Sequence, residues 1–204
     1  MSKRYLGGYI TSNFDPLGFT TQTIIQSGIT VVAPASTSVV VNLLAGMSAG
    51  NIVIAFLGSA EDRTFTWPAG WTELVDAMAG TSSAMTIGYK IIDGTEGSSI
   101  TLTASSAVTN ATSIVVEVKT DVKSLEAATV QTTVNTTSVD PNAMTPLTGF
   151  SRYLFFACYG GAVRASSVTV SSFPTGYTKL QEYIDATSLK VNDGRILQNR
   201  RNYF

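Results

Sequence analysis

The sequence predicts an all-β protein: a single two-sheet β-sandwich of the jelly-roll or immunoglobulin-like kind, with an internal duplication and an extended N-terminal arm. Three observations lead to this prediction. Short runs rich in Val, Ile, Thr and aromatic residues recur along the 204 residues, and such residues favour pleated, half-buried surfaces. Clusters of Gly, Ser, Asn and Asp separate these runs. An aromatic-Pro-x-Gly-aromatic motif occurs twice.

Residues 1–26 are predicted to form the arm, because glycines, a proline and scattered aromatics give neither a helical nor a sustained strand period. The segment is too apolar for a disordered tail. We expect it to be extended and to bury its apolar side chains against another subunit. The residues expected to make this contact are Tyr5, Leu6, Gly7, Gly8, Tyr9, Phe14 and Phe19.

Residues 27–204 are predicted to form the sandwich domain. Short strands at this spacing, separated by turn clusters, are typical of a sandwich or barrel. No stretch of ten or more residues has a convincing helical stripe, and only 121–128 could form one short helical turn. The expected strands are 29–33, 39–43, 52–57, 64–67, 72–76, 84–92, 99–103, 112–119, 129–134, 153–159, 168–170, 177–184 and 189–191.

An internal repeat links two parts of this domain, about 28–94 and 128–194. Both copies contain the pattern aromatic-Pro-x-Gly-aromatic-Thr-x-Leu, and each follows a strand of the buried type. A Lys-x-x-Asp-Gly sequence follows each copy, at 90–94 and 190–194. Each unit is too small to bury its own faces, so the two halves are expected to pair into one sandwich. The residues predicted to form the two corners are Trp67, Pro68, Gly70, Trp71, Phe173, Pro174, Gly176 and Tyr177.

The motif predicts a strand–corner–strand unit. Proline fixes φ, glycine supplies a positive φ, and an aromatic ring on each side of the turn can close it by packing. We interpret these rings mainly as plugs of the core. The alternative is a ligand site that uses Trp67 or Trp71.

The composition argues against catalysis and against several kinds of partner. The chain has no histidine and one cysteine, which removes His-based triads, thiolate clusters and most zinc sites. We therefore expect no catalytic residues, no metal and no cofactor, and we expect that the protein is not an enzyme. The net charge of −1 predicts no binding to nucleic acid or to a membrane. No signal peptide or membrane span is expected, and Cys158 is expected to be a buried, inert thiol.

Three polar features leave alternatives open. Most of the acidic residues are predicted to lie in turns or at strand ends; the carboxylates Glu73 and Asp76 could face one way, as most solvated pairs also do. The loop Asp93–Glu96 is first of all a turn signal, with calcium binding as the weaker alternative. The arginines near the C-terminus, at 195, 200 and 201, are expected to lie on a solvated tail or to contact an acidic partner.

Two stretches of sequence resemble structural proteins of tailed bacteriophages. The start, Lys3-Arg4-Tyr5-Leu6-Gly7-Gly8-Tyr9-Ile10-Thr11-Ser12-Asn13, is similar to the "YLGG" leader of such proteins, although Tyr9 and Asn13 replace more usual small residues. The segments 68–74 (Pro-Ala-Gly-Trp-Thr-Glu-Leu) and 92–97 (Ile-Asp-Gly-Thr-Glu-Gly) are similar to the corner and the strand end of phage β-sandwich proteins. The resemblance implies a virion structural protein, and it supplies no catalytic residues.

From the resemblance and the arm we expect a capsid decoration or cement protein that binds the outer shell. Its partners would be other virion proteins, above all the major capsid protein, and it would form a homo-oligomer such as a trimer. Its location would be the virion, assembled in the host cytoplasm. The alternative is a tail-fibre or tail-tip adsorption module whose exposed aromatics bind a host glycan. A glycan-degrading domain is a third hypothesis, disfavoured by the scarcity of carboxylates.

Overall fold

The computed structural model describes residues 23–32, 35–79, 83–119, 125, 152–163, 177–183 and 191–202. Every regular element within these ranges is a β-strand, and all strand pairs are antiparallel, which confirms the predicted all-β sandwich. None of these residues belongs to a helix that could span a membrane. The strands are β1 (Thr23–Val32), β2 (Ser36–Asn42), β3 (Ile52–Ser59), β4 (Phe65–Thr66), β5 (Thr72–Ala79), β6 (Ser83–Ile91), β7 (Ser99–Val108), β8 (Ala111–Lys119), β9 (Arg152–Val163), β10 (Tyr177–Tyr183) and β11 (Val191–Asn202).

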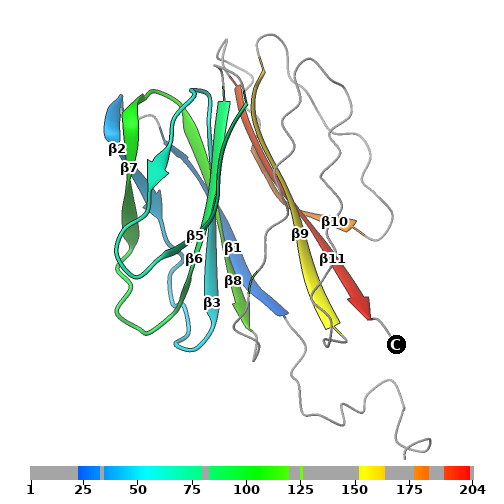
Figure 1. Cartoon of the computed structure of the whole chain (residues 1–204). Helices are drawn as coiled ribbons and strands as arrows, with labels where there is room; N and C mark the ends of the chain where they lie inside the picture. Colours follow the sequence, from blue (N-terminus) through cyan, green and yellow to red (C-terminus); the bar gives the residue numbers. More distant parts are fainter. Residues whose placement is uncertain are drawn as a thin grey trace, which may run out of the picture.

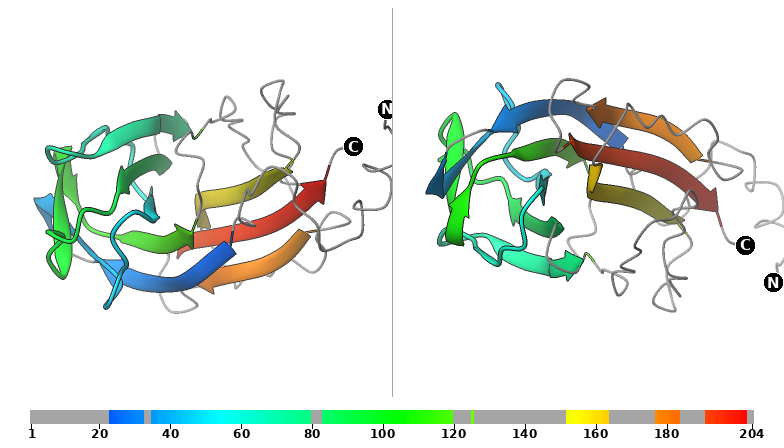
Figure 2. Two further views of the ribbon diagram at one scale, coloured as in Figure 1. Left: turned by 90° about the horizontal axis from the view of Figure 1, so that it is seen from below. Right: turned by 90° about the horizontal axis from the view of Figure 1, so that it is seen from above.

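The strands form a central five-stranded sheet and two three-stranded sheets (Figures 1 and 2). The central sheet has the order β1-β8-β3-β6-β5. The sheet β2-β7-β4 packs on one of its faces and the sheet β10-β11-β9 packs on the other. The structure thus adds a third layer to the two sheets that the sequence predicted.

Strands β3 and β8 form the centre of the molecule because both of their faces are covered. Along β3, Val53, Ala55 and Leu57 pack towards β2-β7-β4, whereas Ile54 and Phe56 pack towards the third sheet. This double burial explains why β3 reads as a continuous apolar run rather than as an alternating pattern. Strand β8 is buried at every position from Ala111 to Val118 for the same reason.

The third sheet is attached to the central sheet by side chains. The rings of Phe56 and Phe156 lie with centroids 6.1 Å apart, and Leu180 joins the same apolar cluster. Gln181 Nε2 on β10 donates a hydrogen bond to Ser27 Oγ on β1 at 2.9 Å. These contacts place the C-terminal part of the chain face to face with the N-terminal part.

The third sheet repeats the strand order of the first half of the chain, because β9-β11-β10 corresponds to β3-β6-β5. Thr72 pairs with Tyr89 of β6, and its motif equivalent, Thr178, pairs with Gln198 of β11. In both copies the register shifts at the motif leucine, between Glu73 and Val75 and between Lys179 and Gln181. These correspondences support the internal duplication, which stays a prediction.

One of the sequence matches does not occupy equivalent positions. Asp93 follows the end of β6, whereas Asp193 lies inside β11 and pairs with Gly161 of β9. The correspondence of β6 with β11 is supported instead by the pairing registers of β5 with β6 and of β10 with β11. The Lys-x-x-Asp-Gly similarity is therefore not part of the shared fold, and β11 continues beyond the expected repeat end to Asn202.

Two further expectations are corrected. Residues 23–26 belong to β1 and pair with β8, so the expected arm of 1–26 is shorter by these residues. A register shift between Ile24 and Gln26 interrupts the strand period, which is why the sequence pattern missed this part of β1. The arginines at 195, 200 and 201 lie in β11, the central strand of its sheet, and not on a tail.

Candidate functional site

The first corner motif forms a tight turn between β4 and β5. Trp71 N–H donates to Pro68 O at 3.2 Å, and Gly70 has a φ of 86°. A positive φ at the third residue of a turn is the position that glycine adopts without steric cost. The turn brings the rings of Trp67 and Trp71 into a stack, with centroids 5.3 Å apart and planes 21° apart.

Trp67 is held from two further sides. Its indole Nε1–H donates to Thr86 Oγ1 at 2.8 Å, and the Thr86 hydroxyl donates to Val75 O at 2.8 Å. Thr86 is fully buried, so this chain of hydrogen bonds satisfies groups that have no access to water. The ring lies directly on Gly88, where an added Cβ would come within 2.6 Å of Trp67 Cδ2. Position 88 therefore has room only for glycine.

Both tryptophans are half-buried and pack against the core between the central sheet and β2-β7-β4. Their indole rings pack the corner turn against this core, which agrees with the interpretation of both rings as part of the core. The sequence pattern identified both rings and the turn. It did not identify Thr86 or Gly88, which lie on β6 and meet Trp67 only through the pairing of β5 with β6.

The other predicted contact residues are distributed differently. Tyr177 is the first residue of β10, and the structure describes its backbone alone. Cys158 lies in β9 opposite Ile196, and its side chain is outside the described residues. The second corner (Phe173, Pro174, Gly176) and the arm residues (Tyr5, Leu6, Gly7, Gly8, Tyr9, Phe14, Phe19) also lie outside the described residues.

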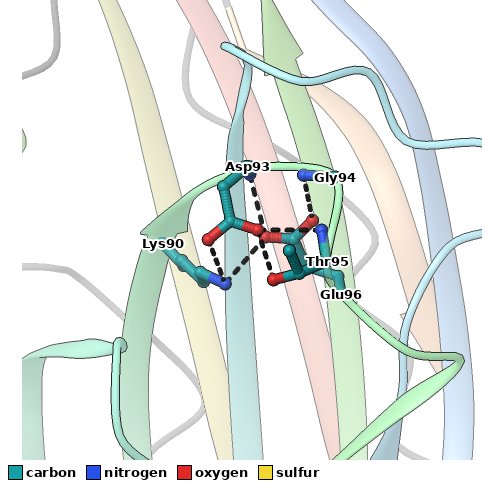
Figure 3. Close-up of polar contacts among 5 residues, drawn as sticks. All are labelled: Lys90, Asp93, Gly94, Thr95 and Glu96. Atoms are coloured by element: carbon teal, nitrogen blue, oxygen red, sulfur yellow. Dashed lines mark hydrogen bonds and ion pairs between the residues drawn. The ribbon is translucent and has the colours of Figure 1, made fainter.

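A charged cluster lies beside the tryptophan corner, at the end of β6 (Figure 3). Lys90 Nζ lies 3.0 Å from Asp93 Oδ2 and 2.9 Å from Glu96 Oε1. Glu96 also accepts hydrogen bonds from the N–H groups of Asp93 and Gly94, and Asp93 accepts from Thr95. A Cβ on Gly70 would lie 3.8 Å from Lys90 Cε, which places the cluster against the corner.

The charges in this cluster stabilise one another. Hydrogen bonds from Thr95, and then from Lys90, hold the pKa of the Asp93 carboxyl well below its usual value. Burial acts to raise the pKa of Glu96, but Lys90 and the loop N–H groups outweigh it and lower that pKa. The hydrogen bonds that Lys90 makes to Glu96 and Asp93 raise the pKa of its ammonium group. All three groups are therefore charged near neutral pH.

The contacts of this cluster stabilise the loop 93–96 and do not form a cation site. The carboxylate oxygens that calcium would require already accept from Lys90 and from the loop's own N–H and O–H groups. Among the described ranges, no group of three or more Asp, Glu, Cys or His side chains could hold a metal. The calcium alternative for 93–96 thus has no support in the geometry.

Two acidic residues are buried in places that the sequence pattern did not indicate. Glu117, near the end of β8, is fully buried and accepts hydrogen bonds from Gln26 Nε2 (2.7 Å), Ser48 N–H (2.9 Å) and Asn51 Nδ2 (2.6 Å). Burial acts to raise the pKa of Glu117, but these three donors outweigh it and lower the pKa. Glu61, 8% exposed, accepts from Ser59 and Thr109.

The expected placement of most acidic residues in turns or at strand ends did not indicate the burial of Glu117, which lies two residues before the end of β8. The available signal was its position inside an apolar run, Ile114-Val115-Val116-Glu117-Val118, because a lone acid there must be satisfied internally. Glu117 on β8 holds the side chain of Gln26 on β1 and the 45–51 loop in place. Its role is structural, since every one of its contacts is made by the fold itself.

The pair Glu73 and Asp76 lies on the edge strand β5. Burial, and then the charge of Asp76, raises the pKa of Glu73. Burial also raises the pKa of Asp76, partly offset by the hydrogen bond that Phe65 N–H donates to its Oδ2 at 3.1 Å. Asp76 thereby fixes β4 to β5, which gives this carboxylate a structural partner.

Comparison with known proteins adds no relative: no family model, curated protein or solved structure matches the chain.

Proposed function

We propose that the chain is a structural component of a tailed-phage virion, specifically a capsid decoration or cement protein that binds the outer shell through its N-terminal residues. The observation that supports this most is the position of β1. It is the first described strand, it begins at Thr23, and it is an edge strand of the central sheet. Residues 1–22, which contain the phage-like leader, precede an edge strand that is anchored to β8 along its length.

The body of the protein suits a structural role. Its central strands are buried on both faces, and its loops are fixed by buried carboxylates and by the Lys90 cluster. Such a body holds its surfaces in a fixed geometry, as a subunit of a regular shell must. The segment before Thr23 would then supply backbone pairing and aromatic contacts to neighbouring subunits.

Deletion of residues 1–22 tests this proposal, because it removes the leader and leaves β1 intact. Purified deletion variant and full-length chain are each titrated onto shells that lack the protein, and bound copies are counted by quantitative mass spectrometry. We expect the full-length chain to approach one copy per shell subunit and the deletion variant to lose binding. Equal binding of both chains would refute the role of the arm. A few copies per particle would refute the decoration role.

The rival proposal is an adsorption module that binds a glycan through Trp67, Trp71 and Tyr177. The geometry gives it less support, because the Trp67 N–H is bonded to Thr86 and both indole rings pack on the core. A glycan array probed with wild type and with Trp71→Ala separates the two proposals. Specific glycan binding that is lost in a folded Trp71→Ala variant would favour the adsorption module.

A further inference from the structure

The carboxylate of Glu117 has no positively charged partner in the described parts of the chain. It is fully buried, and the three groups that donate hydrogen bonds to it, Gln26 Nε2, Ser48 N–H and Asn51 Nδ2, are all neutral. Burying an ionised carboxylate is costly unless hydrogen-bond donors replace the water that it loses. The charge of Glu117 therefore depends on these three donors, and two of them belong to the 45–51 loop.

The elements that surround Glu117 supply no countercharge. Glu117 lies on the face of β8 that packs against β2-β7-β4, next to β1, β3 and the 45–51 loop. None of these neighbouring segments contains Asp, Glu, Lys or Arg. The ionisable groups nearest in the register are Lys119, Lys90, Asp93 and Glu96. Of these, Lys119 is exposed at the end of β8, and Lys90 is bound to the two carboxylates of its own loop.

Protonation of Glu117 would remove its charge and add an O–H donor where three donors already meet. Turning the amide of Asn51 would let its oxygen accept this O–H, but the Ser48 N–H cannot turn. Turning the amide of Gln26 would break the hydrogen bond that its Nε2 donates to Ala45 O at 3.0 Å. The neutral carboxyl therefore cannot satisfy all of its neighbours, and its remaining hydrogen bonds are weaker than those of the carboxylate.

The middle of the 45–51 loop depends on these polar contacts. Backbone hydrogen bonds to the connection between β6 and β7 fix the chain on both sides, at Leu43 and Gly50. Between these points, Ala45 O accepts from β1 and Ser48 N–H donates to β8. Met47 packs half-buried against the core between the central sheet and β2-β7-β4. Loss of the carboxylate would therefore leave this part of the loop held mainly by apolar contact.

We infer that Glu117 is an acid-sensitive latch: protonation of its carboxyl releases the 45–51 loop from β8 and β1 while the strands stay paired. The released loop uncovers Met47 and the end of the core beneath it. Burial acts to raise the pKa of Glu117, but the three donors outweigh it and lower the pKa. The loop is therefore held above pH 4.5 and is released as the pH falls through the folded-state pKa. The inference does not depend on the proposed virion role.

Amide hydrogen exchange of the full chain, measured by NMR from about pH 7 to about pH 3, tests the inference. The ionisation of Glu117 is followed in the same samples by the ¹³C shift of its carboxyl. Ser48 N–H reports the contact with the carboxylate, and Leu57 N–H, in a strand paired on both sides, reports the sheets. As Glu117 titrates, we expect the protection of Ser48 to fall at least about tenfold, as for the loss of a hydrogen bond to a charged group. The protection of Leu57 should stay unchanged.

Two variants show which carboxylate is responsible. Glu117→Gln should have low protection at Ser48 at neutral pH and no step in acid, because the amide cannot ionise. Glu73→Gln is the matched control, since Glu73 is an exposed acid on β5 that does not contact the loop. This control should keep the step of wild type.

Oxidation of methionine by hydrogen peroxide gives a second readout that needs no variant. Met47 is half-buried under the loop, whereas Met78 is 47% exposed on β5. Peptide mass spectrometry compares how fast the two side chains become sulfoxides. Oxidation of Met47 should accelerate relative to Met78 as Glu117 titrates.

Three results would overturn the inference. The first is protection of Ser48, and oxidation of Met47, that stay constant while the carboxyl of Glu117 titrates. The second is a simultaneous loss of protection at Ser48 and Leu57, which would mean global unfolding in place of local release. The third is a Glu117→Gln variant that keeps the step, or a Glu117 carboxyl that stays ionised until the sheets unfold.

Discussion

Replacing Gly88 by alanine tests how the tryptophan corner is built. An alanine Cβ at this position would lie 2.6 Å from Trp67 Cδ2 and 2.7 Å from Cε2 and Cε3, against the 3.4 Å at which ordinary contact begins. These three atoms belong to a rigid ring, so Trp67 must move as a whole. That movement breaks the hydrogen bond to Thr86 and disturbs the stack on Trp71.

The expected loss of stability follows from these contacts. Overpacking of a core costs about 1–3 kcal/mol, and loss of the Trp67–Thr86 hydrogen bond adds about 0.5–1.5 kcal/mol. We therefore expect the Gly88→Ala variant to lose about 2–4 kcal/mol of its free energy of unfolding. At about 2–4 °C per kcal/mol for a chain of this size, the Tm should fall by roughly 5–15 °C.

Urea unfolding monitored by circular dichroism and tryptophan fluorescence measures this effect. Gly97→Ala is the matched control, because its nearest neighbour would be Ser99 O at 3.9 Å. Trp67→Phe in the Gly88→Ala background should recover part of the loss, since the smaller ring leaves space for the methyl group. A Gly88→Ala variant as stable as Gly97→Ala would show that the ring does not rest on the glycine.

Three further predictions concern other contacts. Glu117→Gln should lower the free energy of unfolding by about 2–3 kcal/mol, because an amide cannot accept from all three donors. Folding lowers the pKa of Glu117, so its contribution to stability is present above pH 4.5 and is lost as the pH falls through the folded-state pKa. The Tm of wild type should therefore approach that of Glu117→Gln in acid. Phe56→Ala should cost about 3–5 kcal/mol, and near-ultraviolet circular dichroism should show the loss of the contact with Phe156. Gly70→Ala should cost about 1–2 kcal/mol through its φ of 86° alone, whereas replacement by Asn, which tolerates this region, should cost less in the same melt.

The strands were predicted well where a single local feature, such as an apolar run or a turn motif, indicated them. Strand β3 was predicted from its continuous apolar run, and the strand–corner–strand unit from the turn chemistry of 67–71. Strand β1 was predicted only in part, because the register shift near Ile25 removes the alternation on which the prediction rests. Strand β11 was taken largely for a tail, because arginines inside a strand resemble a solvated segment in sequence.

The candidate site was predictable only within a single stretch of chain. Trp67 and Trp71 are close in sequence, so their stacking could be expected. Thr86 and Gly88 reach the ring through the pairing of β5 with β6, and no local pattern contains that register. The clamp by Glu117 likewise depends on residues that only the folded chain brings together.

The attachment of the third sheet has a consequence for how the molecule opens. No backbone pairing joins β10-β11-β9 to the central sheet in the described parts of the chain, and the contact consists of side chains such as Phe156 and Leu180. The two bodies can therefore separate while the hydrogen-bond ladders of both remain whole. Such an opening would need less free energy than global unfolding. It would uncover a broad apolar face of the central sheet, so transient separation is the step at which this protein would become prone to aggregation.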